Sequence, residues 1–257
     1  MKIIMPCPSC LDAELDVRDG LFGDGIDLPT IAVHVQDMGL YREHCLEGHS
    51  LVVLLENQPY ELLFESGLEA FVEGYFRESI SSFAAALERL YEFSIRAQLI
   101  SDGVDAVAVD AMWRGVSSQS ERQLGMYMGL RTSKDAAPPD VLGQSMTKLR
   151  NSVIHKGYFP KIEEAHAFGE AVYDLIGAEV CRLNERFGSF VQIVKAIRRT
   201  KIYAELKEGE SPQVLFLGLA VARVNELSFS EIVDIARSSM LRRRNGEVPA
   251  GRQSGGC

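Results

Sequence analysis

The sequence contains no apolar run that approaches the ~20 residues needed to span a bilayer. Its first residues, Met1 to Cys7, also lack the apolar stretch of a signal peptide. We therefore expect no membrane partner and a cytoplasmic location. In the cytoplasm the five cysteines are expected to be reduced or to bind metal, which argues against a disulfide framework.

Signatures of several enzyme classes are missing as well. There is no Gly-rich phosphate loop and no Ser/His/Asp arrangement. The acidic stretches at 12–19 and 24–27 indicate loop surface and not a catalytic pair of carboxylates. The net charge of −9 argues against a protein that coats nucleic acid by charge alone, but it leaves room for RNA at a local basic cleft.

Residues 1–64 differ in pattern from the rest of the chain. Short apolar runs of β type at 31–35 and 51–55 alternate with Gly, Asp and Pro turn signals around 19–29. These features predict a small β domain. Beyond it the apolar period becomes helical, so the fold class is expected to be mainly α.

The helical part divides into a bundle over 65–186, a mostly helical extension over 187–244 and a tail over 245–257. The tail is Gly-rich and polar, so we expect it to be disordered. Long helices on either side of a shorter one imply an antiparallel bundle. The expected helices cover 66–100, 104–114, 119–130, 140–156 with Asp140 as the N-cap, 162–186, 187–208 and 229–243, with an apolar run at 214–221.

Four residues of the β region have the spacing of metal ligands. Cys7 and Cys10 form a Cys-x2-Cys turn. Cys45 and His49 form a Cys-x3-His turn. Together they can close a tetrahedral zinc site, and four protein ligands leave no open position, so the zinc is expected to be structural. Because a domain this small buries little apolar surface, the metal would supply much of its folding free energy.

Other interpretations of these residues stay open. Cys7 and Cys10 could be redox-active or free, although a thioredoxin-like pair belongs to an α/β pattern that this region lacks. His44 could compete as the fourth ligand, but it directly precedes Cys45 and would distort the turn. The whole region resembles a zinc ribbon, which implies strands around both ligand pairs.

A second candidate site lies at 150–155, on a predicted helix. Asn151 and His155 are four residues apart and therefore share a helix face. Arg150 lies about 140° from His155 around the helix, so only its long side chain can bring the guanidinium to the same pocket. The planar guanidinium suits a phosphate, and the imidazole can move protons at the reacting oxygen.

RNA carries its own nucleophile, the ribose 2′-OH. A protein needs only to remove that proton, protonate the leaving 5′-oxygen and stabilise the charged phosphorane between them. No metal is required, and DNA cannot react in this way. Arg150, Asn151 and His155 therefore predict metal-independent RNA cleavage, with zinc outside the chemistry. The same residues could instead be a helix cap and a solvated surface.

The pattern Arg150-Asn151-x-x-x-His155 resembles the Arg-x4-His signature of HEPN domains, an all-helical family with many metal-independent RNases. An earlier helix, in which Glu88 follows the alanine-rich stretch at 83–87, resembles the first long helix of these domains. The resemblance implies that Arg150 binds the scissile phosphate and that His155 is the acid–base group. Asn151 would orient one of these two. Glu88 would orient Arg150 or form a surface ion pair.

The resemblance covers about 66–186 and also implies partners. Members of the family commonly form homodimers that bring two Arg/His pairs to one cleft, and many act in antiviral defence or toxin–antitoxin systems. We therefore expect RNA, a second copy of the chain, and a protein trigger or antitoxin as partners. One subset of the family has Tyr two residues after the His, where this chain has Gly157, so Tyr158 receives no such role.

Basic residues extend the candidate RNA surface. Lys148 and Lys156 flank the motif and are predicted to contact phosphates. Clusters at 195–201 and 242–244 could add to this surface or simply complement helix dipoles. Two rival interpretations are a non-catalytic module that binds RNA or a nucleotide, and a regulatory subunit that packs against other proteins.

Overall fold

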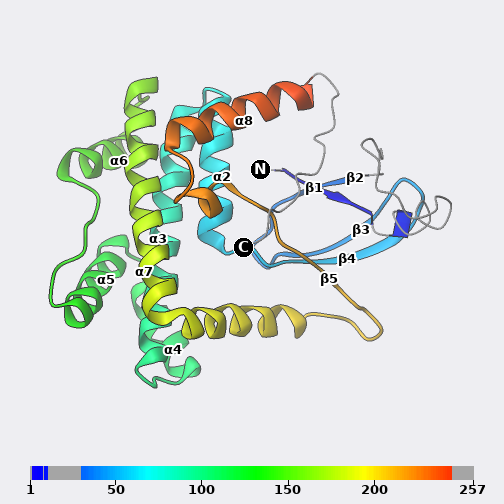
Figure 1. The fold of residues 1–257 in the computed structure, drawn as a ribbon, viewed down its shortest axis with the longest axis horizontal. Helices are drawn as coiled ribbons and strands as arrows, with labels where there is room; N and C mark the ends of the chain where they lie inside the picture. Colours follow the sequence, from blue (N-terminus) through cyan, green and yellow to red (C-terminus); the bar gives the residue numbers. More distant parts are fainter. Residues whose placement is uncertain (1, 8, 11–29, 245–257) are drawn as a thin grey trace.

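A computed structural model describes residues 2–7, 9, 10 and 30–244. The chain is mainly helical, with a small β region in its N-terminal part, as the sequence predicts (Figure 1). Several predicted features lie outside the described residues: the tail at 245–257, the turn signals around 19–29, and the acidic stretches at 12–19 and 24–27.

The β region consists of two small sheets. In the first, β1 (Lys2–Pro6) pairs antiparallel with β2 (Thr30–His34). In the second, β3 (Leu40–His44) pairs antiparallel with β4 (Ser50–Leu55). The apolar runs that predict strands correspond to β2 and β4.

A third strand reaches the second sheet from far along the chain. β5 (Gln213–Leu215) pairs parallel with β4, with Val53 opposite Gln213. Just beyond the strands, the side chain of Asn57 donates to the carbonyl of Leu217 at 3.0 Å and accepts from its N–H at 2.8 Å. The segment predicted as a C-terminal extension thus contributes a strand to the N-terminal β region.

The helical part begins with two helices where the sequence predicts one over 66–100. α2 (Pro59–Val72) starts earlier than expected, and α3 (Phe76–Ser101) follows after a sharp turn. The turn depends on Gly74, whose φ of 84° lies in the left-handed region that side chains disfavour. The N–H groups of Gly74 and its successor donate to carbonyls in the last turn of α2. The prediction of one continuous helix is therefore wrong.

Two glycines let α2, α3 and α7 (Ile162–Tyr203) pack closely around one aromatic ring. A Cβ atom placed at Gly67 in α2 would lie 2.6 Å from the ring of Phe83 in α3. A Cβ atom placed at Gly169 in α7 would lie 2.8 Å from another edge of that ring. Phe229 adds a T-shaped contact to Phe83, with ring centroids 5.9 Å apart. The centre of the bundle therefore depends on direct contact between backbone and ring.

Three shorter helices complete the bundle. They are α4 (Ala106–Val116), α5 (Ser120–Asp135) and α6 (Gln144–Lys156). Each covers most of a predicted helix, although α5 continues beyond its expected end. α5 and α6 both pack against α3.

Asp140 is not the N-cap that the sequence predicts. The residue at the N-cap of α6 is Gly143, and Asp140 lies in the preceding non-helical segment. The physical reason lies in Val141 and Leu142, which pack against the hydrophobic core from that segment. Their burial delays the start of the helix beyond the residue best suited to cap it.

α7 is interrupted at position 187, close to where the sequence predicts that two helices meet. Its backbone departs from helical geometry at Phe187 (φ −133°, ψ 20°), and the helix kinks there. The guanidinium groups of Arg182 and Arg186 lie 5.1 and 5.9 Å from the centre of the Phe187 ring. Both groups also pair with Asp135 at the end of α5. Beyond the kink, α7 runs toward the β region (Figure 1).

The rest of the extension combines short segments with one helix. α7 ends at Tyr203, before the predicted end at 208. The apolar run at 214–221 divides between β5 and a short 3₁₀ helix, η1 (Ala220–Arg223). α8 (Phe229–Arg244) matches the last predicted helix. Among the described residues, no helix has both the length and the apolar character that a bilayer crossing needs.

We expect Gly67→Ala to destabilise the fold by about 1–3 kcal/mol, because its methyl group would overlap a fully buried ring that has no room to move. Urea unfolding followed by circular dichroism measures this change. Gly125→Ala is the matched control, since a Cβ at that position in α5 meets nothing within 4 Å. The control should be neutral or stabilising by up to about 1 kcal/mol. Equal effects of the two substitutions would contradict the close-packing argument.

Candidate functional site

The four predicted metal ligands lie together in the β region. Cys7 directly follows β1, and Cys10 is three residues further on. Cys45 and His49 belong to the turn between β3 and β4. In that turn the N–H of Cys45 donates to the carbonyl of His49 at 3.1 Å. The four ligand atoms all lie within 4.8 Å of one another.

The donor atoms fit a tetrahedral zinc ion. Zn–S bonds of about 2.3 Å and Zn–N bonds of about 2.0 Å would place two sulfur atoms about 3.8 Å apart, and a sulfur and a nitrogen about 3.5 Å apart. The Sγ atoms of Cys10 and Cys45 are 3.7 Å apart. Nδ1 of His49 lies 3.3 to 3.8 Å from the three Sγ atoms. The rival ligand His44 is exposed, pairs with Ser50 in the sheet, and is not part of the cluster.

The thiols of the cluster are buried and differ in acidity. Burial, together with hydrogen bonds to Cys7 and Cys45, raises the pKa of Cys10 to about 12. Burial also favours a higher pKa for Cys45. Hydrogen bonds with the backbone of His49 and Glu47 and with the thiols of Cys7 and Cys10 together outweigh burial and lower the pKa to about 7. Thiolates are the form that binds metal, so an ion entering this cluster would displace protons.

Arg150 lies where α6 packs against α3. Its Nη2 donates to Oε1 of Glu88 in α3 at 2.6 Å, and its Nη1 donates to Oδ1 of Asn151 at 3.1 Å. The side chains of Arg150 and Glu88 expose 16% and 26% of their surfaces. Val153, which is fully buried, anchors α6 at this contact. Two acceptors thus hold the guanidinium while part of it faces solvent.

His155, Lys148 and Lys156 are exposed on α6. His155 lies in the last turn of the helix, which ends at Gly157 with a φ of 69°. Within the described part of the chain, the imidazole of His155 has no hydrogen-bond or ion-pair partner. The structure therefore leaves all three side chains outside the network around Arg150.

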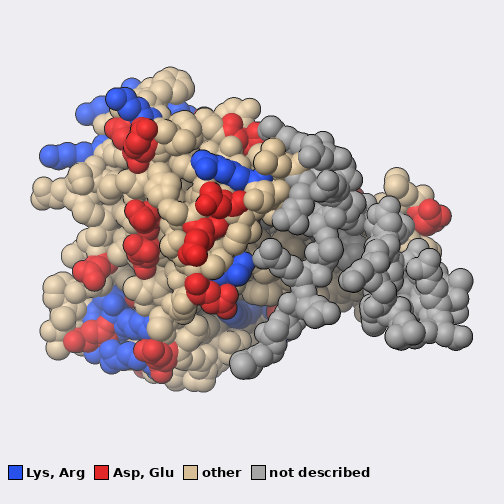
Figure 2. Space-filling view, turned by 45° about the horizontal axis from the view of Figure 1, so that its top comes forward, with Lys and Arg blue, Asp and Glu red and all other residues tan. Residues whose placement is uncertain are grey.

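The basic cluster between Lys195 and Lys201 lies on the second half of α7. On the face of the molecule shown in Figure 2, both acidic and basic side chains are present. Lys195 has no ion-pair or hydrogen-bond partner among the described residues. The other three cations have partners: Arg198 donates to the carbonyl of Leu55, Arg199 pairs with Glu56, and Lys201 pairs with Asp110.

Two cavities lie along the second half of α7, away from the motif on α6. The larger has a volume of about 190 Å³ and is lined by residues of α2, α3, α4 and α7. The smaller, of about 100 Å³, lies at the end of β4. Neither is lined by Arg150, Asn151 or His155. The basic cluster at 195–201 is the feature of the sequence that points to the smaller cavity, because the apolar run at 214–221, which contains Phe216, predicts no binding role.

Comparison with known proteins adds no family to these observations. No protein-family model matches the chain, and neither a curated protein nor a solved structure matches it. The geometry of the described residues therefore carries the functional argument.

We expect a double-mutant cycle of Glu88→Ala and Arg150→Ala to give a coupling energy of about 1 kcal/mol, because this ion pair is largely shielded from solvent. Urea unfolding of the four proteins measures it. The matched control is the pair Arg223–Glu226, whose atoms are 3.4 Å apart and whose side chains expose 36% and 67%. The control pair should couple by less than about 0.5 kcal/mol. A coupling for Glu88 and Arg150 that is no larger would show that their contact is not formed in solution.

Proposed function

We propose that this chain is a metal-independent endoribonuclease of the HEPN type. The observation that carries the proposal is the arrangement on α6. The guanidinium of Arg150 is held by Glu88 and Asn151. The imidazole of His155 lies on the same helix, open to solvent and without a partner among the residues that the structure describes. Such a pair of groups can bind a phosphodiester and move protons at it.

The chemistry follows from the two side chains. The Arg150 guanidinium binds the scissile phosphate and stabilises the charge that develops on it. His155 serves as the acid–base group, either taking the proton of the 2′-OH or giving one to the leaving 5′-oxygen. Lys148 and Lys156, which are both exposed on α6, bind neighbouring phosphates.

We propose that two copies of the chain form the complete site. One imidazole cannot be both protonated and deprotonated in the same step, so a second His155 supplies the other role. The position of α6 at the edge of the bundle supports this, because a second copy can approach it there (Figure 1). A protein trigger or antitoxin would control cleavage, as in antiviral defence or toxin–antitoxin systems.

Zinc has a structural part in this proposal. Three thiolates and one imidazole would fill all four positions of a Zn²⁺ ion, which leaves none for substrate. When bound, the ion would join the segment after β1 to the turn between β3 and β4, much as in a zinc ribbon. The chain's own residues on α6 carry out the cleavage.

We expect His155→Ala and Arg150→Ala each to lower the rate of RNA cleavage by at least about a hundredfold. The assay uses single-stranded RNA in excess chelator, and the products should end in 2′,3′-cyclic phosphates. His34→Ala is the matched control, because His34 is also exposed but lies on β2. Cleavage that survives in both α6 variants, or that needs added Mg²⁺, would rule out this mechanism.

We expect about one zinc ion per chain by elemental analysis of the purified protein. Cys10→Ser should lose this zinc and lower the melting temperature, because the metal stabilises the small β region. Cys181→Ser is the control, since Cys181 lies on α7, outside the cluster, and should keep both properties. A metal-free wild-type protein that melts at the same temperature with and without added Zn²⁺ would contradict the proposal.

A second candidate function is a non-catalytic module that binds RNA or a nucleotide. The observation that favours it is the ion pair of Arg150 with Glu88. Because the guanidinium of Arg150 already pairs with this carboxylate, less of it is available to a reacting phosphate. Tight RNA binding without turnover, unchanged by His155→Ala, would distinguish this function from cleavage.

A further inference from the structure

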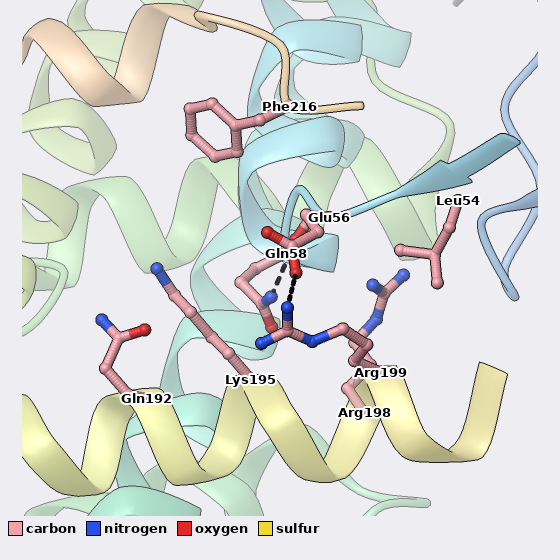
Figure 3. A pocket seen from close by; sticks show the side chains of 8 residues that line it. All are labelled: Leu54, Glu56, Gln58, Gln192, Lys195, Arg198, Arg199 and Phe216. Carbon is pink, nitrogen blue, oxygen red and sulfur yellow. Dashed lines mark hydrogen bonds and ion pairs between the residues drawn. The ribbon is translucent and has the colours of Figure 1, made fainter. Parts of the chain in front are cut away.

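The smaller cavity lies between the end of β4, the second half of α7 and the segment that follows β5. Figure 3 shows side chains of α7 projecting across it toward Glu56 and Gln58, with Phe216 on a separate segment above them. The cavity has a volume of about 100 Å³. Its lining consists of Leu54, Glu56, Gln58, Gln192, Lys195, Arg198, Arg199 and Phe216.

The charge around this cavity is positive, although the chain as a whole is acidic. Three cations from α7 line it, and Glu56 is its one carboxylate. Arg199 pairs with Glu56 at 3.0 Å, which neutralises one of the cations. Lys195 is half-buried and unpartnered among the described residues, so its ammonium group is available to an anion. Lys195 and Arg198 therefore form no ion pair with any described residue, although the charges of Glu61 and Glu56 act on Arg198.

Arg198 is held in place without an ion pair to any residue that the structure describes. Its Nη1 donates to the carbonyl of Leu55 at 3.3 Å. Gly39, with a φ of 69°, makes room for it, because a Cβ there would lie 3.1 Å from Nη2 of Arg198. Burial lowers the pKa of Arg198 and outweighs the opposing charges of Glu61, Tyr41 and Glu56. An anion in the cavity would offset more of the cost of this burial.

Phe216 offers an aromatic face beside these cations. Its side chain is 55% exposed, although large apolar side chains usually become buried. The backbone next to it is fixed, because Leu217 exchanges two hydrogen bonds with Asn57 and Leu215 accepts one from the N–H of Glu56. The ring is therefore exposed on an ordered segment, which suits it to stack against another flat ring.

We infer that this cavity binds one nucleotide unit, with its phosphate at Lys195, Arg198 and Arg199 and its base stacked on Phe216. A cationic pocket beside an aromatic face is the combination that recognises a phosphate linked to a flat ring. The exposed amide group of Gln192 provides donors and an acceptor at the rim, whereas Gln58 is buried and its Nε2 donates to the carbonyl of Glu56 at 3.1 Å. None of these residues belongs to the Arg150 network, so the site is independent of the proposed cleavage.

The nucleotide unit has two sources, a free mononucleotide or one residue of a single-stranded RNA. Isothermal titration calorimetry with uridine 5′-monophosphate and with a short oligouridylate separates them. The protein carries His155→Ala, so that RNA is not cut during the titration. Binding of both ligands shows that the cavity takes the unit from either source. Binding of the oligouridylate alone identifies the RNA strand as the source.

We expect Lys195→Ala and Phe216→Ala each to weaken binding about tenfold, through loss of the charged contact and of the stacking contact. Lys195→Arg should keep most of the affinity. Lys207→Ala removes an equal charge from an exposed position outside the cavity, and Leu241→Ala truncates an apolar side chain that is 59% exposed on α8. Both controls should bind as the parent does. Lys195→Met replaces Lys195→Ala if the latter melts at a lower temperature.

Three results would overturn the inference. The first is that neither ligand binds at millimolar concentration. The second is that both ligands bind equally well to the parent and to the variants at Lys195 and Phe216. The third is that inorganic phosphate binds as tightly as uridine 5′-monophosphate, which would mean that Phe216 does not recognise the base.

Discussion

The rest of the structure depends on the packing of the Phe83 ring against the backbones of two neighbouring helices. The ring lies directly against the backbone of α2 at Gly67 and of α7 at Gly169, because neither position carries a Cβ atom. These contacts set the spacing of three helices, and Phe229 closes the cluster from α8. Glu88 follows on the same helix as Phe83, so the packing of α3 also determines where Arg150 finds its acceptor.

β4 connects the two candidate sites of the β region. The turn that contains Cys45 and His49 leads directly into this strand, and its other end borders the cationic cavity at Leu54. β5 pairs with the same strand and brings Phe216 to that end. A metal ion at one end would therefore stiffen the strand that forms part of the wall at the other. The motif on α6 lies apart from both, and its geometry depends on α3.

The sequence predicts features that rest on local spacing and misses those that rest on distant contacts. Helical periodicity identifies the bundle, and the two ligand pairs identify the cysteine–histidine cluster. The break at Gly74 is missed because the apolar period continues across it through Val72 and Phe76. β5 is missed because a strand of three residues has little local pattern and depends on its partner. The contact between Arg150 and Glu88, 62 residues apart, was expected only by resemblance to a family.

The parallel pairing of β4 and β5 has a consequence for how the chain matures. Asn57 and Leu217, which bond to each other beside these strands, are 160 residues apart. During synthesis the N-terminal half leaves the ribosome before β5 has been made, so the edge of β4 that β5 later occupies is unpaired. The sheet becomes complete only after the bundle has been made and α7 has carried the chain back. Closing so long a loop is slow, so the bundle would fold first and serve as the template on which the β region is finished.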